Sequence, residues 1–324
     1  MPDAPHKEIL DREIFRIRIS ESFAPQLELL EQMVNYGTNL IPRCFDSSGK
    51  KWPDIVCIGS FFKHAVGALD AIHLLVREGS TTACEAHIRS VFEINLYLEW
   101  IFQADYEKRG VAYSVWNIRK KRYWNCCGIE GTAEHKAHQK HMQHLKTGGV
   151  SKRFSQEELK AAIEKNDECL RHPELADVNA LFDKSKETMG REVDWYVPFG
   201  ANNLREIAIK LKKEGQYKIF FSRLSEATHG KTLEHQLYYS LREGKIHFDH
   251  LRTLDRVDDV LRMTFPQAKN LFQKVIERYC KDEKDAFQRK FQNEWREAYR
   301  RIPRVSKQEG SYEVTPSEAP ASEN

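Results

Sequence analysis

Residues 82–104, TACEAHIRSVFEINLYLEWIFQA, are the part of the sequence that is most informative about the fold. Over positions 91–102 the only polar residues are Glu93, Asn95 and Glu99. A helix of this composition is apolar on nearly every face, so other helices must surround it. The stretch therefore predicts the central helix of an all-α core.

Charged residues follow a pattern of their own in this helix. Glu85, Arg89 and Glu93 succeed one another at intervals of four, which places them on one stripe of the helix. If the stripe is buried, its charges must be paired or must face a cavity. Two interpretations remain open: a structural ion pair at the end of a core helix, or a site lined by Arg89 and Glu93.

Composition places the chain among soluble proteins. It has 324 residues, of which 40% are hydrophobic and 31% charged, and its net charge is +3. A charge this small creates no global field that selects a nucleic acid or a membrane as partner. The length suits one large helical domain or two small ones, and we expect one.

Cysteine usage predicts a reducing compartment. The chain has seven cysteines, an odd number, with no C-x-x-C pair, which favours free thiols in a cytosol. The N-terminal sequence MPDAPHKEILDRE is charged and lacks an apolar signal region, and no run of about 18 apolar residues occurs. We therefore expect a cytoplasmic protein without a membrane contact. The cysteines are Cys44, Cys57, Cys84, Cys126, Cys127, Cys169 and Cys280.

Apolar periodicity and turn residues predict the remaining elements. An N-terminal helix should restart at Pro25 and end at Gly37, and a later helix should kink or split at Pro266. QLYYSLREGKIHFDHL, after residue 235, is compatible with a short hairpin or an irregular loop. The core helices are expected near 54–78, 82–104, 202–229 and 255–280, inside a single helical bundle of residues 1–302, with 107–190 as a polar helical insertion or lid and 303–324 as a disordered tail.

A basic and aromatic run lies inside the polar insertion. Arg119, Lys120, Lys121 and Arg122 are consecutive in a segment that also contains several aromatic residues. Cations interleaved with aromatic rings suit a phosphate backbone and stacked bases, so these four residues are candidate nucleic-acid ligands. Consecutive charges on a helix also simply cover its solvated side, and this alternative stays open.

Four histidines follow at intervals of three: His135, His138, His141 and His144. Neighbouring members of such a series lie close enough on a helix to share a metal ion. Steps of about 300° nevertheless spread the four over half of the helix circumference, and no H-E-x-x-H motif accompanies them. We therefore predict no metal and no cofactor, and a solvated polar face is the alternative.

The second informative stretch is FFSRLSEATHG at residues 220–230. It reads as the end of a helix, with His229 at the C-terminal turn, where the helix dipole favours the cationic imidazole. We hypothesise that Arg89 and Glu93 meet Ser225 and His229 in one pocket. In that pocket Glu93 would orient Arg89, and His229 would be the group that titrates.

These elements resemble the DUF5677 family of unknown function. The resemblance is carried by an apolar helix with Arg and Glu four apart, here IRSVFEINLYL with Arg89 and Glu93, and by a later Ser-x-x-x-His, here LSEATHG with Ser225 and His229. It spans roughly residues 55–275 and implies a helical fold with a shared polar centre.

A broader resemblance concerns HEPN-type helical ribonucleases of toxin and phage-defence systems. Their signature is an Arg followed by a His after four to six residues, and Arg223 and His229 have that spacing, as do Arg242 and His247. The resemblance implies metal-independent RNA cleavage, in which the histidine moves a proton and the arginine stabilises the phosphorane. It also implies a homodimer with two such pairs in one cleft.

Three functional classes therefore remain after the sequence is read. The chain is a binding or regulatory module in a defence or stress context, an endoribonuclease, or a nucleic-acid binder. A module that binds a protein partner would use aromatic residues expected to be exposed, such as Trp195, Tyr196 and Phe199. Phosphate-binding glycine loops and the serine-hydrolase elbow G-x-S-x-G are absent from the sequence.

Overall fold

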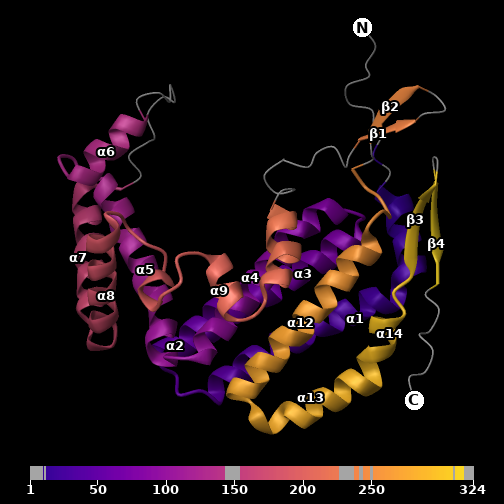
Figure 1. Cartoon of the computed structure of the whole chain (residues 1–324), viewed down its shortest axis with the longest axis horizontal. Helices are drawn as coiled ribbons and strands as arrows, with labels where there is room; N and C mark the ends of the chain where they lie inside the picture. Colours follow the sequence, from indigo (N-terminus) through magenta and orange to yellow (C-terminus); the bar gives the residue numbers. More distant parts are fainter. Residues whose placement is uncertain are drawn as a thin grey trace. The chain divides into compact units, whose positions relative to one another are not determined.

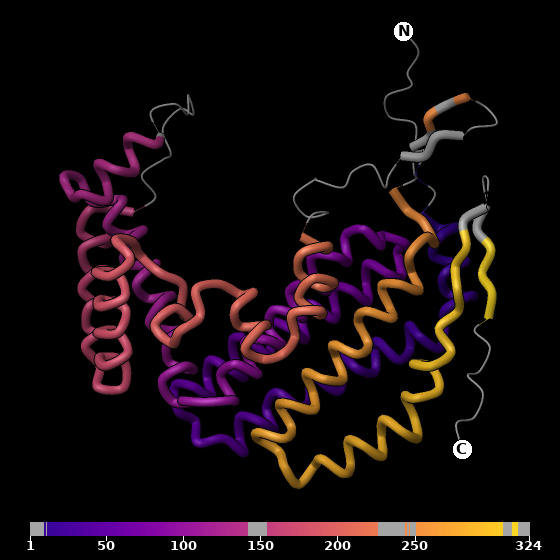
Figure 2. The backbone as a smooth tube through the Cα atoms, viewed as in Figure 1, coloured from indigo at the N-terminus to yellow at the C-terminus, as the bar shows by residue number. Residues whose placement is uncertain are grey.

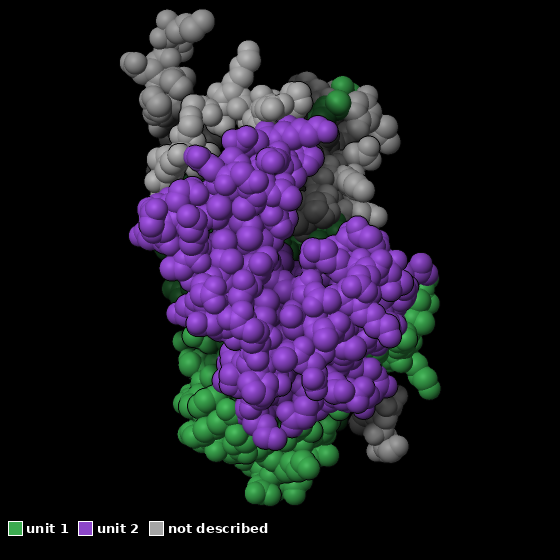
Figure 3. Space-filling view, turned by 90° about the vertical axis from the view of Figure 1, so that its left-hand side faces the viewer, with its two compact units in different colours: residues 1–50, 57–102, 208–324 green, residues 51–56, 103–207 purple. Residues whose placement is uncertain are grey.

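The structure is a computed structural model that describes residues 10, 12–142, 154–225, 237–240, 244–248, 251–308 and 311–316. The described chain is predominantly helical, which confirms the all-α prediction (Figure 1). It divides into two compact units, coloured separately in Figure 3. Unit 1 consists of residues 1–50, 57–102 and 208–324, and unit 2 of residues 51–56 and 103–207. The predicted insertion at 107–190 falls inside unit 2, which extends beyond it on both sides.

Unit 1 is built on four long helices. The central helix predicted at 82–104 is confirmed as α4. Of the other three helices, α1 and α3 come from the N-terminal part of the chain and α12 from the C-terminal part. Helices α3 and α12 pack against α1, and α12 also contacts α3. Aliphatic and aromatic side chains fill the space between them, including Leu69, Phe92 and Phe272, all almost fully buried. The four helices are α1 (Arg12–Asp46), α3 (Lys63–Arg77), α4 (Thr81–Gln103) and α12 (Val257–Tyr279).

Helix α1 differs from the prediction at its glycine. It continues through Gly37 to Asp46, although Gly37 was expected to end it. A Cβ atom at Gly37 would lie 2.8 Å from Cγ2 of Val66 and 3.0 Å from Cε1 of Phe272. Gly37 therefore permits the close approach of α3 and α12 to α1 rather than a turn. The predicted restart at Pro25 corresponds to a local break, since Phe23 has a non-helical φ of −127°.

The chain enters α3 through a widened helical turn. Residues 52–77 form a continuous helical stretch in which α2 (Trp52–Asp54) leads into the π-helix η2 (Ile55–Phe62) and then into α3. This stretch, Trp52–Arg77, is the one helix among the described residues that is long and apolar enough to cross a membrane, with a mean hydropathy of 1.5. Of its most apolar window, 56% is buried inside the structure, a property that the core helices of soluble domains share.

Helix α12 also differs from the prediction, because it runs without interruption past Pro266, as the tube in Figure 2 traces. Proline removes one backbone hydrogen bond, and the buried residues on both sides of it, Phe265 and Gln267, hold the helix in the core. The last helical stretch of unit 1 has a π-helical centre. Its parts are α13 (Lys284–Lys290), η7 (Phe291–Trp295) and α14 (Arg296–Arg300), preceded by the short 3-10 turn η6 (Lys281–Glu283).

The core helix expected at 202–229 is broken. Three short elements replace it, and Lys212, with a φ of 58°, lies at the first break. The positive φ cannot occur inside a right-handed helix, so the chain turns before Lys213 and starts again. The elements are α9 (Leu204–Lys210), α10 (Glu214–Tyr217) and the π-helix η4 (Lys218–Arg223), and the helical conformation continues to Ser225.

Two short antiparallel hairpins complete unit 1. The hairpin compatible with the sequence after residue 235 is confirmed: β1 (Leu237–Ser240) pairs with β2 (Lys245–Phe248). The expected disordered tail differs over its first half, where β3 (Arg304–Gln308) pairs with β4 (Ser311–Thr315). Val305 faces Val314 in this register, and Arg262 of α12 donates a 2.7 Å hydrogen bond to the Ile302 carbonyl just before β3. Residues 317–324 lie outside the described part of the chain.

Unit 2 is a smaller helical assembly around α5. Helix α5 packs against α6, α7 and α8, and against α2 at its start. Helix α7 begins with a capping box, in which Ser155 and Glu158 exchange hydrogen bonds between side chain and backbone. Its elements are α5 (Tyr106–Cys127), α6 (Ala133–Met142), α7 (Gln156–Arg171), α8 (Pro173–Met189) and the 3-10 turn η3 (Val197–Phe199).

Candidate functional site

The charged stripe of α4 begins with a structural ion pair. The carboxylate of Glu85 lies 2.6 Å from the guanidinium of Arg256, the residue before α12. Only 4% of the Glu85 side chain is exposed. A carboxylate buried to this extent requires its partner, so the pair joins α4 to the start of α12. Glu85 is therefore assigned to the architecture and not to the site.

One turn further along α4 lies the cluster that we call the Arg89 cluster: Arg89, Glu93, Phe221 and Ser225. The Arg89 Nε donates a 2.8 Å hydrogen bond to Glu93, and its Nη1 donates a 3.0 Å hydrogen bond to the Ser225 hydroxyl. The guanidinium carbon lies 4.1 Å from the centre of the Phe221 ring, within the range of a cation–π contact. Two helical segments far apart in sequence thus hold one guanidinium.

Apolar contacts fix η4 against α4 around this cluster. The ring of Phe220 stacks on that of Phe92 with centroids 5.4 Å apart, and Leu224 is buried. Phe221 stacks in turn on Tyr217, one helical turn earlier, at 4.9 Å. Phe220 and Phe221 lie within the π-helical segment η4, and Leu224 follows it directly. Wide turns of this kind occur frequently at functional sites.

Electrostatics distinguish the two charged members of the cluster. Burial raises the pKa of Glu93, and the positive charge of Arg89 and its hydrogen bond oppose that increase without cancelling it. Both side chains keep some exposure, 21% for Arg89 and 25% for Glu93. A guanidinium has five N–H donors, and the described contacts of Arg89 use two of them. The cluster can therefore accept an anion from the solvent side.

The remaining predicted site residues have different fates. His229 lies outside the described residues, so the structure places three of the four members of the hypothesised pocket. Arg223 is exposed at the end of η4 and is not part of the cluster. Arg242, in the second match to the ribonuclease spacing, also lies outside the described residues.

A second charged cluster on α4 was missed when the sequence was read. Glu99 lies 2.6 Å from the ammonium group of Lys213 and 2.8 Å from that of Lys274. Lys274 also donates a 3.2 Å hydrogen bond to the side-chain oxygen of Asn95, whose amide donates to the Gln267 carbonyl. The sequence feature that could have indicated this cluster is the presence of Asn95 and Glu99 in an otherwise apolar helix.

Burial and charge act against each other in this second cluster. Burial and, to a smaller extent, the charge of Lys213 lower the pKa of Lys274 to about 8, although Glu99 opposes both effects. Burial alone would raise the pKa of Glu99, but Lys274 and Lys213 together hold it below its usual value. The cluster joins α4, α12 and the segment before α10, so we interpret it as the support on which η4 rests.

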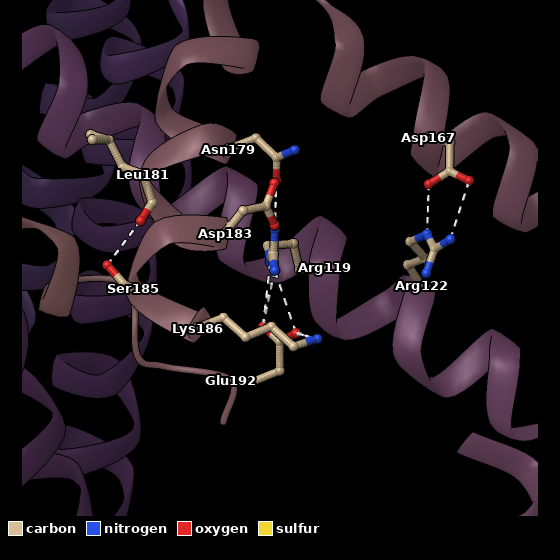
Figure 4. Close-up of polar contacts among 9 residues, drawn as sticks. All are labelled: Arg119, Arg122, Asp167, Asn179, Leu181, Asp183, Ser185, Lys186 and Glu192. Carbon is tan, nitrogen blue, oxygen red and sulfur yellow. Dashed lines mark hydrogen bonds and ion pairs between the residues drawn. The ribbon is translucent and has the colours of Figure 1, made fainter. Parts of the chain in front are cut away.

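The arginines proposed as nucleic-acid ligands are paired with acidic groups inside unit 2 (Figure 4). The Nη1 atom of Arg119 donates to Asn179 and to Asp183, at 2.8 and 2.7 Å, and its Nη2 lies 3.3 Å from Glu192. The Arg122 Nε donates a 2.6 Å hydrogen bond to Asp167 of α7. These contacts join α5 to α7 and α8. The carboxylates neutralise the positive charges of the two guanidinium groups, which a phosphate group would need for binding.

The two lysines between these arginines remain at the surface. Lys120 lies with its ammonium group 4.2 Å from the centre of the Trp116 ring, and Lys121 is exposed. Exposed lysines on a helix contribute at most a general attraction for polyanions. The structure therefore supports the solvated-face interpretation of this run more than a built nucleic-acid site.

The histidine series lies on α6, and its contacts are ordinary ones. The His135 ring lies 3.3 Å from the Gln139 amide, and the His138 ring packs edge-on against Trp124. His141 is exposed, and His144 lies outside the described residues. Among the residues that the structure describes, no three His, Cys, Asp or Glu side chains gather closely enough to hold a metal ion.

The aromatic residues expected to form an exposed partner surface are mostly core residues, and that expectation is wrong. Trp195 and Tyr196 are 2% and 8% exposed, and Phe199 is half-buried. Trp195 packs edge-on against Tyr113 of α5. The loop that carries them therefore contributes to the core of unit 2.

Comparison with known proteins gives one match. The model of a family of unknown function, DUF5677, matches residues 55–246, which is more than half of the chain. The match includes α4 and η4, and so every residue of the Arg89 cluster. Searches of the curated proteins and of the solved structures find no match.

Proposed function

The chain belongs to the DUF5677 family, whose function is unknown, and we propose that it binds single-stranded RNA with Arg89 as a phosphate ligand. The Arg89 cluster carries this proposal. Its guanidinium is oriented by Glu93, Ser225 and Phe221 before any ligand arrives. A cation held in this way loses little conformational freedom on binding, which favours affinity.

The chain next to the cluster has the composition of a surface for single-stranded nucleic acid. Residues 210–223, KLKKEGQYKIFFSR, combine cations with three aromatic residues and contain one acidic residue, Glu214. The cations attract a phosphate backbone, and aromatic rings provide stacking surfaces for unpaired bases. The exposed cations of this segment are Lys210, Lys212, Lys218 and Arg223.

Single-stranded RNA fits this surface better than a duplex does. Phe220 and Phe221 belong to η4 and are only half-buried, so bases must leave their own stack to reach them. A duplex presents phosphates but no free base faces. The combination of one oriented guanidinium with neighbouring aromatic rings therefore favours unpaired bases linked by phosphates.

The test is binding of a fluorescein-labelled single-stranded oligoribonucleotide of roughly 16 nucleotides, followed by anisotropy over a series of salt concentrations. We expect the affinity of Arg89→Met to fall tenfold or more. The slope of log K against log salt should fall by about one, as expected for the loss of one phosphate contact. Circular dichroism checks that the variant keeps its helical content.

Arg171→Gln is the matched control. Arg171 is 63% exposed, carries the same charge and pairs only with Glu164 among the contacts described for it. Its removal should leave the affinity within a factor of two. Equal losses in Arg171→Gln and Arg89→Met would reduce the binding to a general charge effect and overturn the proposal, as would an affinity that neither variant changes.

Metal-independent RNA cleavage is the second candidate, and the raised pKa of Glu93 beside Arg89 favours it. A carboxyl group that titrates nearer to neutral pH is a better general acid–base than an ordinary one. In such a reaction the ribose 2′-oxygen attacks the phosphorus and loses its proton to a base, and the departing 5′-oxygen receives a proton from an acid. His229, four residues after Ser225 in sequence, is the candidate for one of these transfers, and Arg223 is the alternative cation.

Cleavage is tested by expressing the chain and His229→Ala side by side in a bacterial host and following growth and the integrity of total RNA. Fragmentation by the unmodified chain alone would establish the second candidate. Intact RNA in both cultures, together with Arg89-dependent binding in vitro, would establish binding without cleavage.

A further inference from the structure

A groove lies on unit 1 between α3 and α4. It has a volume of about 480 Å³, within the range of small-molecule sites. Its described lining comes from η2 and the first half of α3, with one residue from α4. The lining residues are Gly59, Ser60, Lys63, His64, Gly67, Ala68 and His87.

The local sequence explains why the surface is hollow here. Gly59 and Gly67 are exposed, and a Cβ atom at either position would meet no other heavy atom within 4 Å. None of the described elements fills the space beside these glycines. The absent side chains therefore leave room for a ligand to approach the helix backbone. Gly59 also lies in the π-helix η2, a wide turn of the type found at binding sites.

The groove is basic. Lys63 and His64 project from α3, and His87 reaches it from α4, while no described lining residue is acidic. Burial lowers the pKa of His87, and the neighbouring His64 lowers it further. Two imidazoles beside a lysine, with no acidic residue in the described lining, form a site that suits an anion.

We propose that this groove binds a phosphate monoester of nucleotide size, such as a nucleoside monophosphate. Lys63 supplies a fixed positive charge, and the Ser60 hydroxyl can donate a hydrogen bond to a phosphate oxygen. His87, whose pKa burial lowers in the empty groove, gains a proton as the dianion enters. A carboxylate carries one charge and would balance fewer of these groups.

This groove is distinct from the Arg89 cluster. His87 and Arg89 are two positions apart on α4, which separates their side chains by about 200° around the helix axis. The same helix therefore presents one cationic centre to η4 and another to α3. The proposal does not rest on RNA binding, and either can fail alone.

Isothermal titration calorimetry with AMP, inorganic phosphate and adenosine tests the groove. AMP should bind, phosphate should bind more weakly and adenosine should not bind. His87→Asn and Lys63→Met should each weaken AMP at least tenfold. Lys63 is exposed, so its substitution leaves the fold intact even if that of half-buried His87 does not.

His135→Asn, a half-buried histidine of unit 2, is the control and should bind AMP as the unmodified chain does. The affinity for AMP should also decrease as the pH rises from 6.5 to 8, because the proton that His87 takes up on binding becomes less available. Unchanged AMP binding in Lys63→Met and His87→Asn would overturn the proposal. AMP binding that is lost in Arg89→Met and kept in His87→Asn would place the nucleotide at Arg89 instead, and tight Ni²⁺ binding without AMP binding would make the groove a metal site.

Discussion

Arg89 of α4 and Arg119 of α5 are both paired arginines over aromatic rings, yet their surroundings differ. Arg119 is 13% exposed and is engaged by two carboxylates and an amide, so nitrogen atoms of its whole guanidinium are used. Arg89 is 21% exposed and is engaged by one carboxylate and one hydroxyl. The first arrangement saturates a guanidinium and joins helices, whereas the second orients a guanidinium and leaves donors for a ligand.

The comparison shows that a basic sequence run is a poor guide to a binding site. The four consecutive cations at 119–122 drew attention because of their density, but acidic partners from α7 and α8 neutralise both arginines. Arg89 is isolated in an apolar helix. A single cation in such a helix must either be neutralised by an acidic partner or bind an anion. Glu93 neutralises the charge of Arg89 only in part.

The largest effect is expected at the purely structural pair of α4. Arg256→Met should lower the free energy of unfolding by about 3 kcal/mol, because it leaves the buried Glu85 carboxylate without its partner. Urea denaturation followed by circular dichroism measures this. The double variant Glu85→Gln/Arg256→Met should recover part of the loss, and a single variant as stable as the unmodified chain would contradict the assignment.

Lys274 provides the next effect, in the form of a pH dependence. Its pKa is about 8 in the folded chain and 10.5 for an ordinary lysine, so the unfolded chain binds more protons between these values. Stability should therefore rise with pH over that interval, by about 1–3 kcal/mol. Lys274→Met should lack this increase when the two are compared by urea denaturation at pH 7.5 and 9.5. If stability changed with pH equally in the unmodified chain and in Lys274→Met, the pKa of Lys274 would not be lowered in the folded chain.

A smaller loss of stability is expected at Arg119. Arg119→Met removes contacts to partly exposed carboxylates and should destabilise unit 2 by about 1–2 kcal/mol, mainly through the amide of Asn179 and the loss of order between α5 and α8. Hydrogen exchange of α8 amides is the readout. If the α8 amides exchanged faster to the same extent in Arg171→Gln, the loss of order between α5 and α8 would not be specific to Arg119.

Ser225→Ala should have the smallest effect. It removes one neutral hydrogen bond to Arg89 at 3.0 Å, so RNA affinity should fall about threefold to fivefold while stability changes by less than about 1 kcal/mol. Ser225→Thr keeps the hydroxyl and should restore most of the affinity. A loss as large as that of Arg89→Met would mean that Ser225 contacts the ligand itself.

Local sequence patterns were sufficient for the helices and for one pairing within a helix. The i, i+4 spacing of Arg89 and Glu93 predicts their contact directly, and the apolar composition of α4 predicts its burial. Gly37 and Pro266 misled because their local meaning was overridden by tertiary packing: Gly37 admits Val66 and Phe272, and the core holds α12 straight across Pro266.

Long-range partners were beyond the reach of sequence patterns. Nothing near Glu85 or Glu99 in sequence indicates Arg256, Lys213 or Lys274, because these contacts depend on how distant helices meet. The same holds for the carboxylates around Arg119. The groove could not be derived from local sequence patterns either, because its basic lining depends on the placement of α3 beside α4.

The RNA affinity of Arg89→Met, measured beside that of Arg119→Met, tests most directly whether Arg89 is the phosphate ligand. Both variants are measured at one salt concentration and at a temperature where both are folded. We expect a loss of tenfold or more for Arg89→Met and a change within twofold for Arg119→Met. A larger loss for Arg119→Met than for Arg89→Met would contradict this expectation and would move the binding surface to α5.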